Sequence, residues 1–294
     1  MSRQPRSLLF VPADSARKID KALRGEADVM LLDLEDSVAP ANKARARDAA
    51  REAIAAARRD AALARRRIFV RINALDSGLA DADLDAVMQA GPEAILLPKC
   101  ASGRDVQQLG AKLAVREAEN ALPDGATCIL ALATETAASL FNLGTYAGAS
   151  RRLRGLTWGA EDLSADVGSL TARREGGGYT APYQLARSLT LFGAAAAEVA
   201  AIDTVFPAFR DHQGFMAECL AAARDGFVGK LAIHPDQVAA INEIFTPSST
   251  EIARARAVVA AFAAESGAGV LAIDGEMVDR PHLRRAERLL ARLW

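Results

Sequence analysis

The sequence has few of the side chains that form disulfides or bind zinc. Its 294 residues include only three cysteines and three histidines. The cysteines, Cys100, Cys128 and Cys219, form no CxxC pair, and the histidines lack the spacing of a zinc site. The sequence therefore argues against a disulfide scaffold and a zinc enzyme, and a reduced cytoplasmic setting is expected.

Long apolar runs and an excess of one charge are also missing. The 36 Lys and Arg nearly cancel the 37 Asp and Glu, so composition gives no reason to expect nucleic acid or a membrane as partner. The apolar run 8–13 is too short for the core of a signal peptide. No segment approaches the roughly 18 apolar residues of a membrane span.

Two glycine motifs that hold nucleotides in open α/β sheets are absent as well. No GxGxxG follows the first strand-like run, and GxxxxGK[ST] occurs nowhere. Instead, short continuous apolar runs alternate with longer segments rich in Ala, Arg and Glu, which is typical of parallel strands buried on both faces. This rhythm predicts a (β/α)8 TIM barrel over residues 1–245, with a doubly wound sheet as the alternative. The predicted strands are 8–12, 29–34, 68–72, 94–97, 129–134, 156–158, 202–206 and 230–233.

Residues 246–294 depart from the rhythm of the barrel. They predict a helix over 251–265, a hairpin that turns at Asp274-Gly275, and a final helix over 283–293. A barrel needs none of these elements. We therefore expect a C-terminal helix–hairpin–helix extension that serves as an oligomer contact or as a lid.

Acidic side chains follow two consecutive predicted strands. Glu135 comes after the fifth strand, and Glu161 and Asp162 come after the sixth. Because the carboxyl ends of barrel strands form the active-site face, these acids should lie together. Mg²⁺ takes oxygen ligands and needs only one or two carboxylates. We predict that Glu135 and Asp162 bind Mg²⁺ or Mn²⁺ and that Glu161 orients Asp162 or bonds backbone amides; the alternative for Glu135 is a helix cap.

Basic side chains occupy the neighbouring strand ends. Arg71 lies between apolar residues of the third strand, where an unpaired guanidinium would be costly, so it should meet a fixed anion. That anion is either a substrate carboxylate or a structural partner such as Glu35 or Asp36. Lys99, after the fourth strand, suits an anionic substrate or an acid of the second strand.

Other polar groups have simpler interpretations. Arg151, Arg152 and Arg154 precede the sixth strand and are expected to be solvated. His234 follows the eighth strand and is expected to be structural rather than a general base. Gly176–Gly178 indicate a flexible loop.

Seven segments along the chain occur in one order: Arg6-Ser7-Leu8-Leu9-Phe10-Val11-Pro12, Leu32-Asp33-Leu34-Glu35-Asp36-Ser37-Val38, Val70-Arg71-Ile72-Asn73, Leu97-Pro98-Lys99, Thr134-Glu135-Thr136-Ala137, Gly159-Ala160-Glu161-Asp162-Leu163 and Ile233-His234-Pro235. Together they resemble the citrate lyase β-subunit group of the HpcH/HpaI aldolase superfamily, which includes malyl-CoA and citramalyl-CoA lyases.

The resemblance implies a (β/α)8 barrel, Mg²⁺, and reversible carbon–carbon cleavage of a 3-hydroxyacyl-CoA thioester, such as citryl-, malyl- or citramalyl-CoA. The products would be a 2-oxo acid and an acyl-CoA. The metal ligands of the family fall on Glu135 and Asp162, and its carboxylate-binding arginine falls on Arg71. Homotrimers or hexamers are implied, and the long tail favours a free-standing enzyme over a subunit that depends on an acyl carrier protein.

The tail segment Met277-Val278-Asp279 resembles the segment that, in the CoA lyases, brings an acid from a neighbouring subunit. Asp279 is therefore the candidate acid/base group, with Asp36 and Lys99 orienting the waters of the metal and the other charges. Arg6 and Arg17 are candidate phosphate contacts. Two alternatives stay open: an aldolase that acts on free hydroxy-keto acids without CoA, and a non-catalytic protein that binds acyl-CoA.

Overall fold

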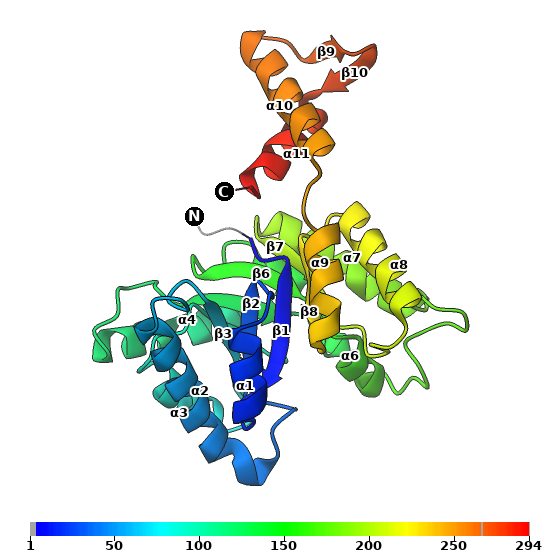
Figure 1. Cartoon of the computed structure of the whole chain (residues 1–294). Coiled ribbons are helices and arrows are strands. Elements are labelled where there is room, and N and C mark those ends of the chain that lie inside the picture. Colours follow the sequence, from blue (N-terminus) through cyan, green and yellow to red (C-terminus); the bar gives the residue numbers. More distant parts are fainter. Residues whose placement is uncertain (1–3, 266, 294) are drawn as a thin grey trace. The chain divides into compact units, whose positions relative to one another are not determined.

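The structure, a computed structural model, describes residues 4–265 and 267–293. The chain divides into two compact units (Figure 1). Residues Pro5–Glu243 form the larger unit, and the chain from Ile244 onward forms the body of the smaller one. No helix in the described ranges is both long and apolar enough to cross a membrane.

The larger unit is a closed parallel barrel. Strands β1 to β8 pair in sequence order, each parallel to its neighbours, and β8 closes the barrel against β1. This confirms the predicted (β/α)8 TIM-barrel class. The strands are β1 Ser7–Pro12, β2 Val29–Asp33, β3 Arg67–Arg71, β4 Ala94–Leu97, β5 Cys128–Leu132, β6 Leu153–Thr157, β7 Ala200–Asp203 and β8 Gly229–Ala232.

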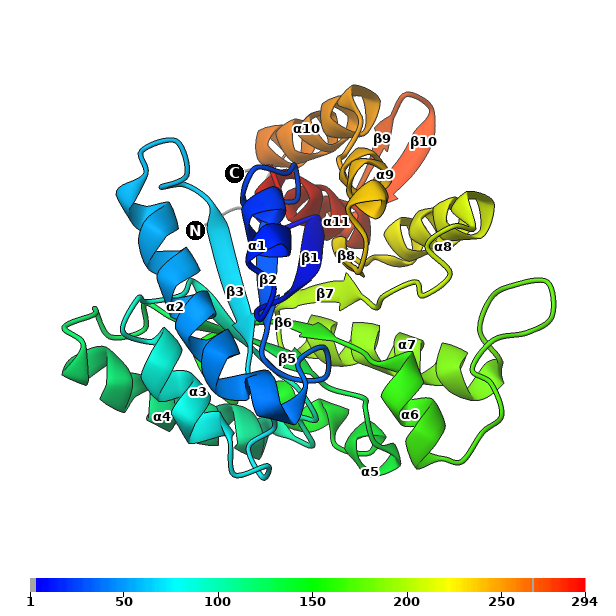
Figure 2. The ribbon, with the colours of Figure 1, turned by 60° about the horizontal axis from the view of Figure 1, so that its bottom comes forward.

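Helices connect successive strands and surround the barrel (Figure 2). Parallel neighbours cannot be joined by a hairpin, so each connection crosses over outside the sheet. In α2, small apolar residues recur every three or four positions and are buried, which lets the helix pack closely. The helices of this unit are α1 Ala16–Leu23, α2 Lys43–Arg59, α3 Ala80–Val87, α4 Gly103–Glu119, α5 Ala137–Leu140, α6 Ala160–Asp166, α7 Ala181–Ala196, α8 His212–Asp225 and α9 Val238–Ile244.

The barrel interior is filled by alternate residues of the strands. β2 contributes Leu31 and β3 contributes Phe69 to one apolar cluster. Side chains two residues apart point to the same face of a strand. The next inward positions, at the carboxyl ends of these strands, are therefore Asp33 and Arg71. The core ends where the charged groups begin, so chemistry is confined to the end of the barrel.

The smaller unit is a helix–hairpin–helix, as predicted. It consists of α10 Ser249–Ala264, β9 Val270–Ile273, β10 Glu276–Asp279 and α11 Arg280–Ala291. The hairpin turns at Asp274 and Gly275, whose φ angles of 53° and 80° are those of a two-residue type I′ turn. Its own apolar core comprises Ala255, Val258, Phe262, Val278 and Ala286.

The expectation that Arg152 is solvated is wrong. Its side chain is 5% exposed and donates to both oxygens of Glu117 on α4, each at 2.7 Å. Glu117 also accepts the backbone N–H groups of Gly125 and Thr127, at 2.9 and 2.8 Å. Of Arg151, Arg152 and Arg154, only Arg152 forms this buried ion pair with Glu117. The sequence alone does not show which of the three arginines faces the helix layer.

Arg152→Met leaves Glu117 buried without its cation. We expect the free energy of unfolding, measured by urea denaturation, to fall by about 3–5 kcal/mol, as for other broken buried ion pairs. The matched control is Arg151→Met, because Arg151 pairs with Asp124 at the exposed surface. The control should change the free energy by no more than about 0.5 kcal/mol. Equal effects of the two substitutions would contradict this assignment.

Candidate metal centre and active site

Arg71 and Asp33 form the first charged pair above the barrel core. Arg71 Nε and Nη2 lie 2.7 and 2.8 Å from the two oxygens of Asp33, in a two-point contact. Burial of Asp33 opposes its ionisation, but Arg71 outweighs burial and holds the pKa of Asp33 below its usual value. Asp33 was not among the partners considered for Arg71. The two residues stand at the ends of consecutive strands, β2 and β3, and the register between these strands pairs them directly.

Glu35 joins this pair to Lys99. Arg71 Nη1 lies 3.0 Å from Glu35 Oε2, and Lys99 Nζ lies 2.6 Å from Glu35 Oε1. Asp36 is more exposed and sits 3.7 Å from both cations. Of the partners that the sequence left open, Arg71 thus contacts both Glu35 and Asp36. Lys99 likewise meets the acids of the second strand.

Lys99 connects the basic residues to Glu135. Its φ of 49° is uncommon for a residue with a side chain, and such a conformation typically costs about 1–3 kcal/mol. With this backbone, the Lys99 N–H donates to Glu135 Oε2 while its ammonium reaches Glu35. Burial opposes the charge of Lys99, but Glu35 raises the pKa of Lys99 above its usual value.

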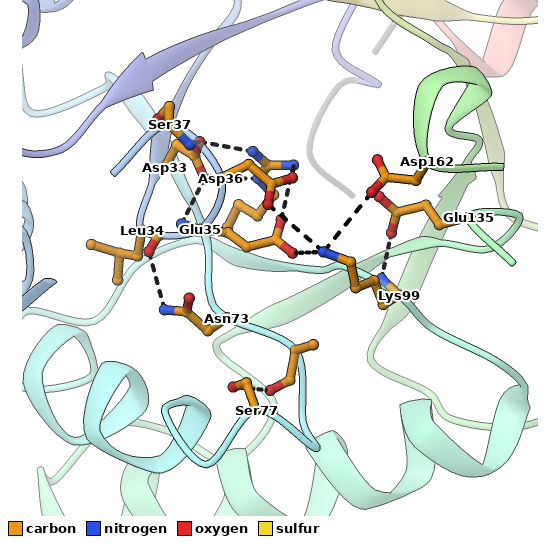
Figure 3. A network of polar contacts seen from close by, with 12 residues as sticks. Asp33, Leu34, Glu35, Asp36, Ser37, Asn73, Ser77, Lys99, Glu135 and Asp162 are labelled. Atoms are coloured by element: carbon orange, nitrogen blue, oxygen red, sulfur yellow. Dashed lines mark hydrogen bonds and ion pairs between the residues drawn. The ribbon is translucent and has the colours of Figure 1, made fainter. Parts of the chain in front are cut away.

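Asp162 faces Glu135 from the next connection of the barrel (Figure 3). The sequence did not predict the helix α6, which begins directly after Gly159 and carries Glu161 and Asp162 in its first turn. Asp162 Oδ1 is 3.9 Å from Lys99 Nζ. Glu161 is exposed. The acids predicted at two strand ends therefore come together, with Asp162 held at a helix start.

Glu135 forms no ion pair in the described part of the chain, and the charge of Arg71 only partly offsets its burial. It is 3% exposed, and burial, followed by the charge of Asp162, raises its pKa to about 8. A divalent cation bound by these two acids would offset the cost of burial and the repulsion between them. In the described ranges, no three His, Cys, Asp or Glu side chains gather to hold a metal. The site thus fits a cation that takes two carboxylates and completes its shell with water or substrate oxygens, as Mg²⁺ does.

Gly159 leaves room for Glu135. A Cβ atom at position 159 would lie 2.8 Å from Glu135 Cγ, closer than real contacts allow. The two strand ends therefore approach each other more closely than any residue with a side chain at 159 would permit. This is a packing reason for the glycine in the Gly159-Ala160-Glu161-Asp162 segment.

A buried ionic network that the sequence analysis missed lies behind Asp162. Asp203, at the end of β7, accepts the indole N–H of Trp158 at 2.8 Å and the Lys230 ammonium at 2.8 Å. Asp203 and Lys230 are completely buried. Burial opposes ionisation of Asp203, but Lys230 and Arg187 hold its pKa below the usual value. Because Trp158 directly precedes Gly159, this network fixes the chain where α6 begins.

The loop around Gly176–Gly178 is fastened to the same network. Arg173 and Tyr179 pair across the neck of the loop, and Arg173 Nη2 donates to the Tyr179 hydroxyl at 2.8 Å. Arg173 also lies 2.7 Å from Glu218, which contacts Lys230 at 2.8 Å. The glycines permit the turn, but the base of the loop is anchored.

Asp279 and His234, two residues that the sequence analysis considered, both have capping roles. Asp279 belongs to the smaller unit, where it caps α11 and its Oδ1 lies 2.6 Å from His282 Nδ1. His234 stacks on Phe209, with ring centroids 4.6 Å apart, and its side chain caps the turn at Pro235–Gln237. These contacts are consistent with a structural His234, and within its own unit Asp279 has a capping role.

Comparison with known proteins places this arrangement in a family. Residues 6–235 match HpcH/HpaI aldolase/citrate lyase. Citrate lyase subunit beta of Leuconostoc mesenteroides subsp. cremoris is 34% identical, over 98% of this chain and 93% of that protein. The (3S)-malyl-CoA thioesterase of Cereibacter sphaeroides is 35% identical, over 98% and 94%.

A solved structure agrees over nearly the whole chain. The protein CitE from Mycobacterium tuberculosis, in complex with magnesium, acetoacetate and coenzyme A, is 34% identical with a TM-score of 0.75, over 99% of this chain and 98% of that one. The sequence matches and the shared fold together confirm the resemblance seen in the sequence segments. The chain belongs to the HpcH/HpaI aldolase/citrate lyase family.

Proposed function

We propose that this lyase uses Mg²⁺ to cleave, or form, the carbon–carbon bond of a 3-hydroxyacyl-CoA thioester, with a 2-oxo acid and an acyl-CoA as the other reactants. The observation that carries the proposal is the buried Glu135 beside Asp162, a pair of acids in which burial and the charge of Asp162 raise the pKa of Glu135 to about 8. Relatives named for citrate lyase and malyl-CoA, and a neighbour solved with magnesium and coenzyme A, support the substrate class.

Glu135 and Asp162 are the residues that would hold the metal. When bound there, Mg²⁺ supplies Lewis-acid stabilisation for negative charge on the substrate oxygen next to the breaking bond. The carboxylates fix the position of that charge relative to the barrel, because Glu135 is held by packing against Gly159 and Asp162 by the start of α6. This is positioning by a rigid scaffold.

Arg71 is the proposed clamp for the carboxylate of the 2-oxo acid. Asp33 holds Nε and Nη2, which fixes the guanidinium plane. Nη1 lies 3.0 Å from Glu35 and 3.7 Å from Asp36. A substrate carboxylate would replace Glu35 at Nη1, and Glu35 would keep its contact with Lys99. Asp36 and Lys99 then orient the surrounding water and charges.

The cleavage also needs a proton at the carbon that leaves. As the bond breaks, the hydroxyl proton passes to water, which gives the 2-oxo acid and the enolate of the acyl thioester. The enolate then takes a proton at its α-carbon to give the acyl-CoA. We propose that Asp279 from a neighbouring copy donates this proton, that residues 246–294 act as its lid, and that the protein assembles as a homotrimer or hexamer in the cytoplasm.

Thioester hydrolysis is a second candidate, favoured by the relative named (3S)-malyl-CoA thioesterase. A panel assay separates the candidates. The purified protein with Mg²⁺ is offered citryl-, malyl- and citramalyl-CoA and a free hydroxy-keto acid, and 2-oxo acid and free thiol are measured. We expect 2-oxo acid from at least one thioester, and none after the metal is removed with EDTA. Free thiol without 2-oxo acid would identify a thioesterase. Cleavage of only a free hydroxy-keto acid would identify a CoA-independent aldolase.

The metal ligands are tested by Glu135→Gln and Asp162→Asn. Each should weaken Mn²⁺ binding, followed by electron paramagnetic resonance, by more than the roughly 10- to 100-fold typical of losing an outer partner. The matched control is Glu161→Gln, which changes an exposed acid next to Asp162 and should leave affinity unchanged. A variant with wild-type Mn²⁺ affinity would remove that residue from the metal site.

Sharing of the site between subunits is tested by complementation. Asp279→Asn and Arg71→Ala should each be inactive alone, because each lacks one part of the site. When the two chains are mixed and allowed to exchange subunits, some sites receive both intact residues, so part of the activity should return. Mass spectrometry confirms that mixed oligomers have formed. If these oligomers stay inactive, the proton donor is not Asp279 of a neighbouring subunit.

A further inference from the structure

A cavity lies at the end of the barrel opposite Glu135 and Asp162. Its volume is about 520 Å³, and its lining includes Ile68 near the start of β3, Glu93 just before β4 and Thr127 just before β5. This size is within the range of pockets that bind small molecules. The packed interior of the barrel separates it from the metal acids, so a molecule bound here cannot take part in the reaction.

Positive charge dominates the lining of this cavity. Arg58, Arg65 and Arg66 contribute to it, against one carboxylate, Glu93. Glu93 is already neutralised by Arg67, whose Nε and Nη2 lie 2.6–3.0 Å from its oxygens. In residues 4–265 and 267–293, none of the three lining arginines forms an ion pair. Like charges gathered around one cavity repel each other and attract anions.

Arg66 shows most clearly that a counter-charge is missing. Its Nη2 donates to the Ala22 carbonyl at 2.7 Å, but its buried Nε has no partner among the described atoms. Burial holds the pKa of Arg66 below its usual value, and only Asp28 acts in the other direction. Asp28 is paired with Arg6 at 2.7 Å. In contrast, carboxylate partners raise the pKa of Arg6 itself.

Arg58 approaches the cavity from the last turn of α2. Its Nη2 donates to the carbonyl of Gly91, and this contact fixes the side chain at the cavity. One backbone acceptor leaves most of the five guanidinium donors available. Arg65 is exposed and adds a third set of donors. These groups match the oxygens of a phosphate or a carboxylate, which guanidinium groups bind in two-point contacts.

Apart from Gly91 and Thr127, the remaining lining residues are apolar. An anion with an apolar body would fit this surface better than a bare ion, because the ring or chain would cover carbon atoms that are exposed in the cavity. The apolar contributors are Ile54, Ala57, Leu63, Ala64, Ile68, Pro92, Leu122, Pro123 and Ala126.

We propose that this arginine cavity is a binding site for a small organic anion, in which a phosphate or carboxylate group contacts Arg58, Arg65 and Arg66 and an apolar group lies against the remaining lining. Such a ligand would bind independently of the metal and of the thioester. The site therefore does not depend on the proposed reaction.

The test uses two probes that share a ring and differ in the anionic group, phenyl phosphate and phthalate. Each is titrated calorimetrically into the full-length, metal-free protein at about 0.15 M ionic strength, where non-specific attraction is largely screened. We expect saturable one-to-one binding of at least one probe. Arg58→Gln and Arg66→Gln should each weaken it about tenfold, as expected for loss of a charge-assisted hydrogen bond. The preferred probe identifies phosphate or carboxylate as the anionic group.

Two controls make the result specific. Arg59→Gln removes an equal charge from the same turn of α2, outside the lining, and should leave the affinity unchanged. Glu135→Gln should also leave it unchanged. Thermal unfolding identifies a variant that fails to fold, and Arg58→Gln keeps the test valid if Arg66→Gln disturbs the contact with Ala22. Absence of saturable binding, an equal loss in Arg59→Gln, or a loss in Glu135→Gln would overturn the proposal.

Discussion

The site depends on a chain of charges across the carboxyl ends of β2, β3 and β4. Arg71 is held between Asp33 and Glu35, and Glu35 is held between Arg71 and Lys99. Carboxylates at the end of an apolar core need cations, because burial penalises their charge. Arg71 outweighs this penalty at Asp33, whose pKa is lowered, but the cations only partly offset it at Glu35, whose pKa is raised. Beyond Lys99, Glu135 receives a backbone N–H but forms no ion pair among the described residues, and its pKa rises to about 8. The imbalance falls where a metal would bind.

The barrel makes this row of ion pairs possible because it places the carboxyl ends of neighbouring strands side by side. Asp33 and Arg71 occupy paired positions on neighbouring strands, directly above the apolar interior. Asp203 and Lys230 play a related part on the outer side of β7 and β8, where they hold Trp158 and the start of α6. The acids that we assign to the metal are thus supported from within the barrel and from its helix layer.

The positions of the barrel strands were predictable from sequence, but their exact bounds and the partners of their side chains were not. Continuous apolar runs located each strand, because strands buried on both faces need apolar side chains throughout, but β6 begins at Leu153 rather than 156 and β7 ends at Asp203 rather than 206. The acids after two of these runs gave Glu135 and Asp162 by the same logic. The partner of Arg71 required the register between strands, which no local pattern encodes. Arg152 and Lys230 were missed because a charged residue buried by a distant acid has the same local sequence as a solvated one.

Anomalous X-ray scattering from crystals soaked with Mn²⁺ tests the central claim most directly. If the two acids form the metal centre, one strong peak should lie about 2.1 Å from carboxylate oxygens of Glu135 and Asp162, the distance typical of a small divalent cation and its oxygen ligands. The Arg71 contact with Asp33 should remain. A peak elsewhere, or no peak at saturating Mn²⁺, would contradict the assignment of these acids as the metal site.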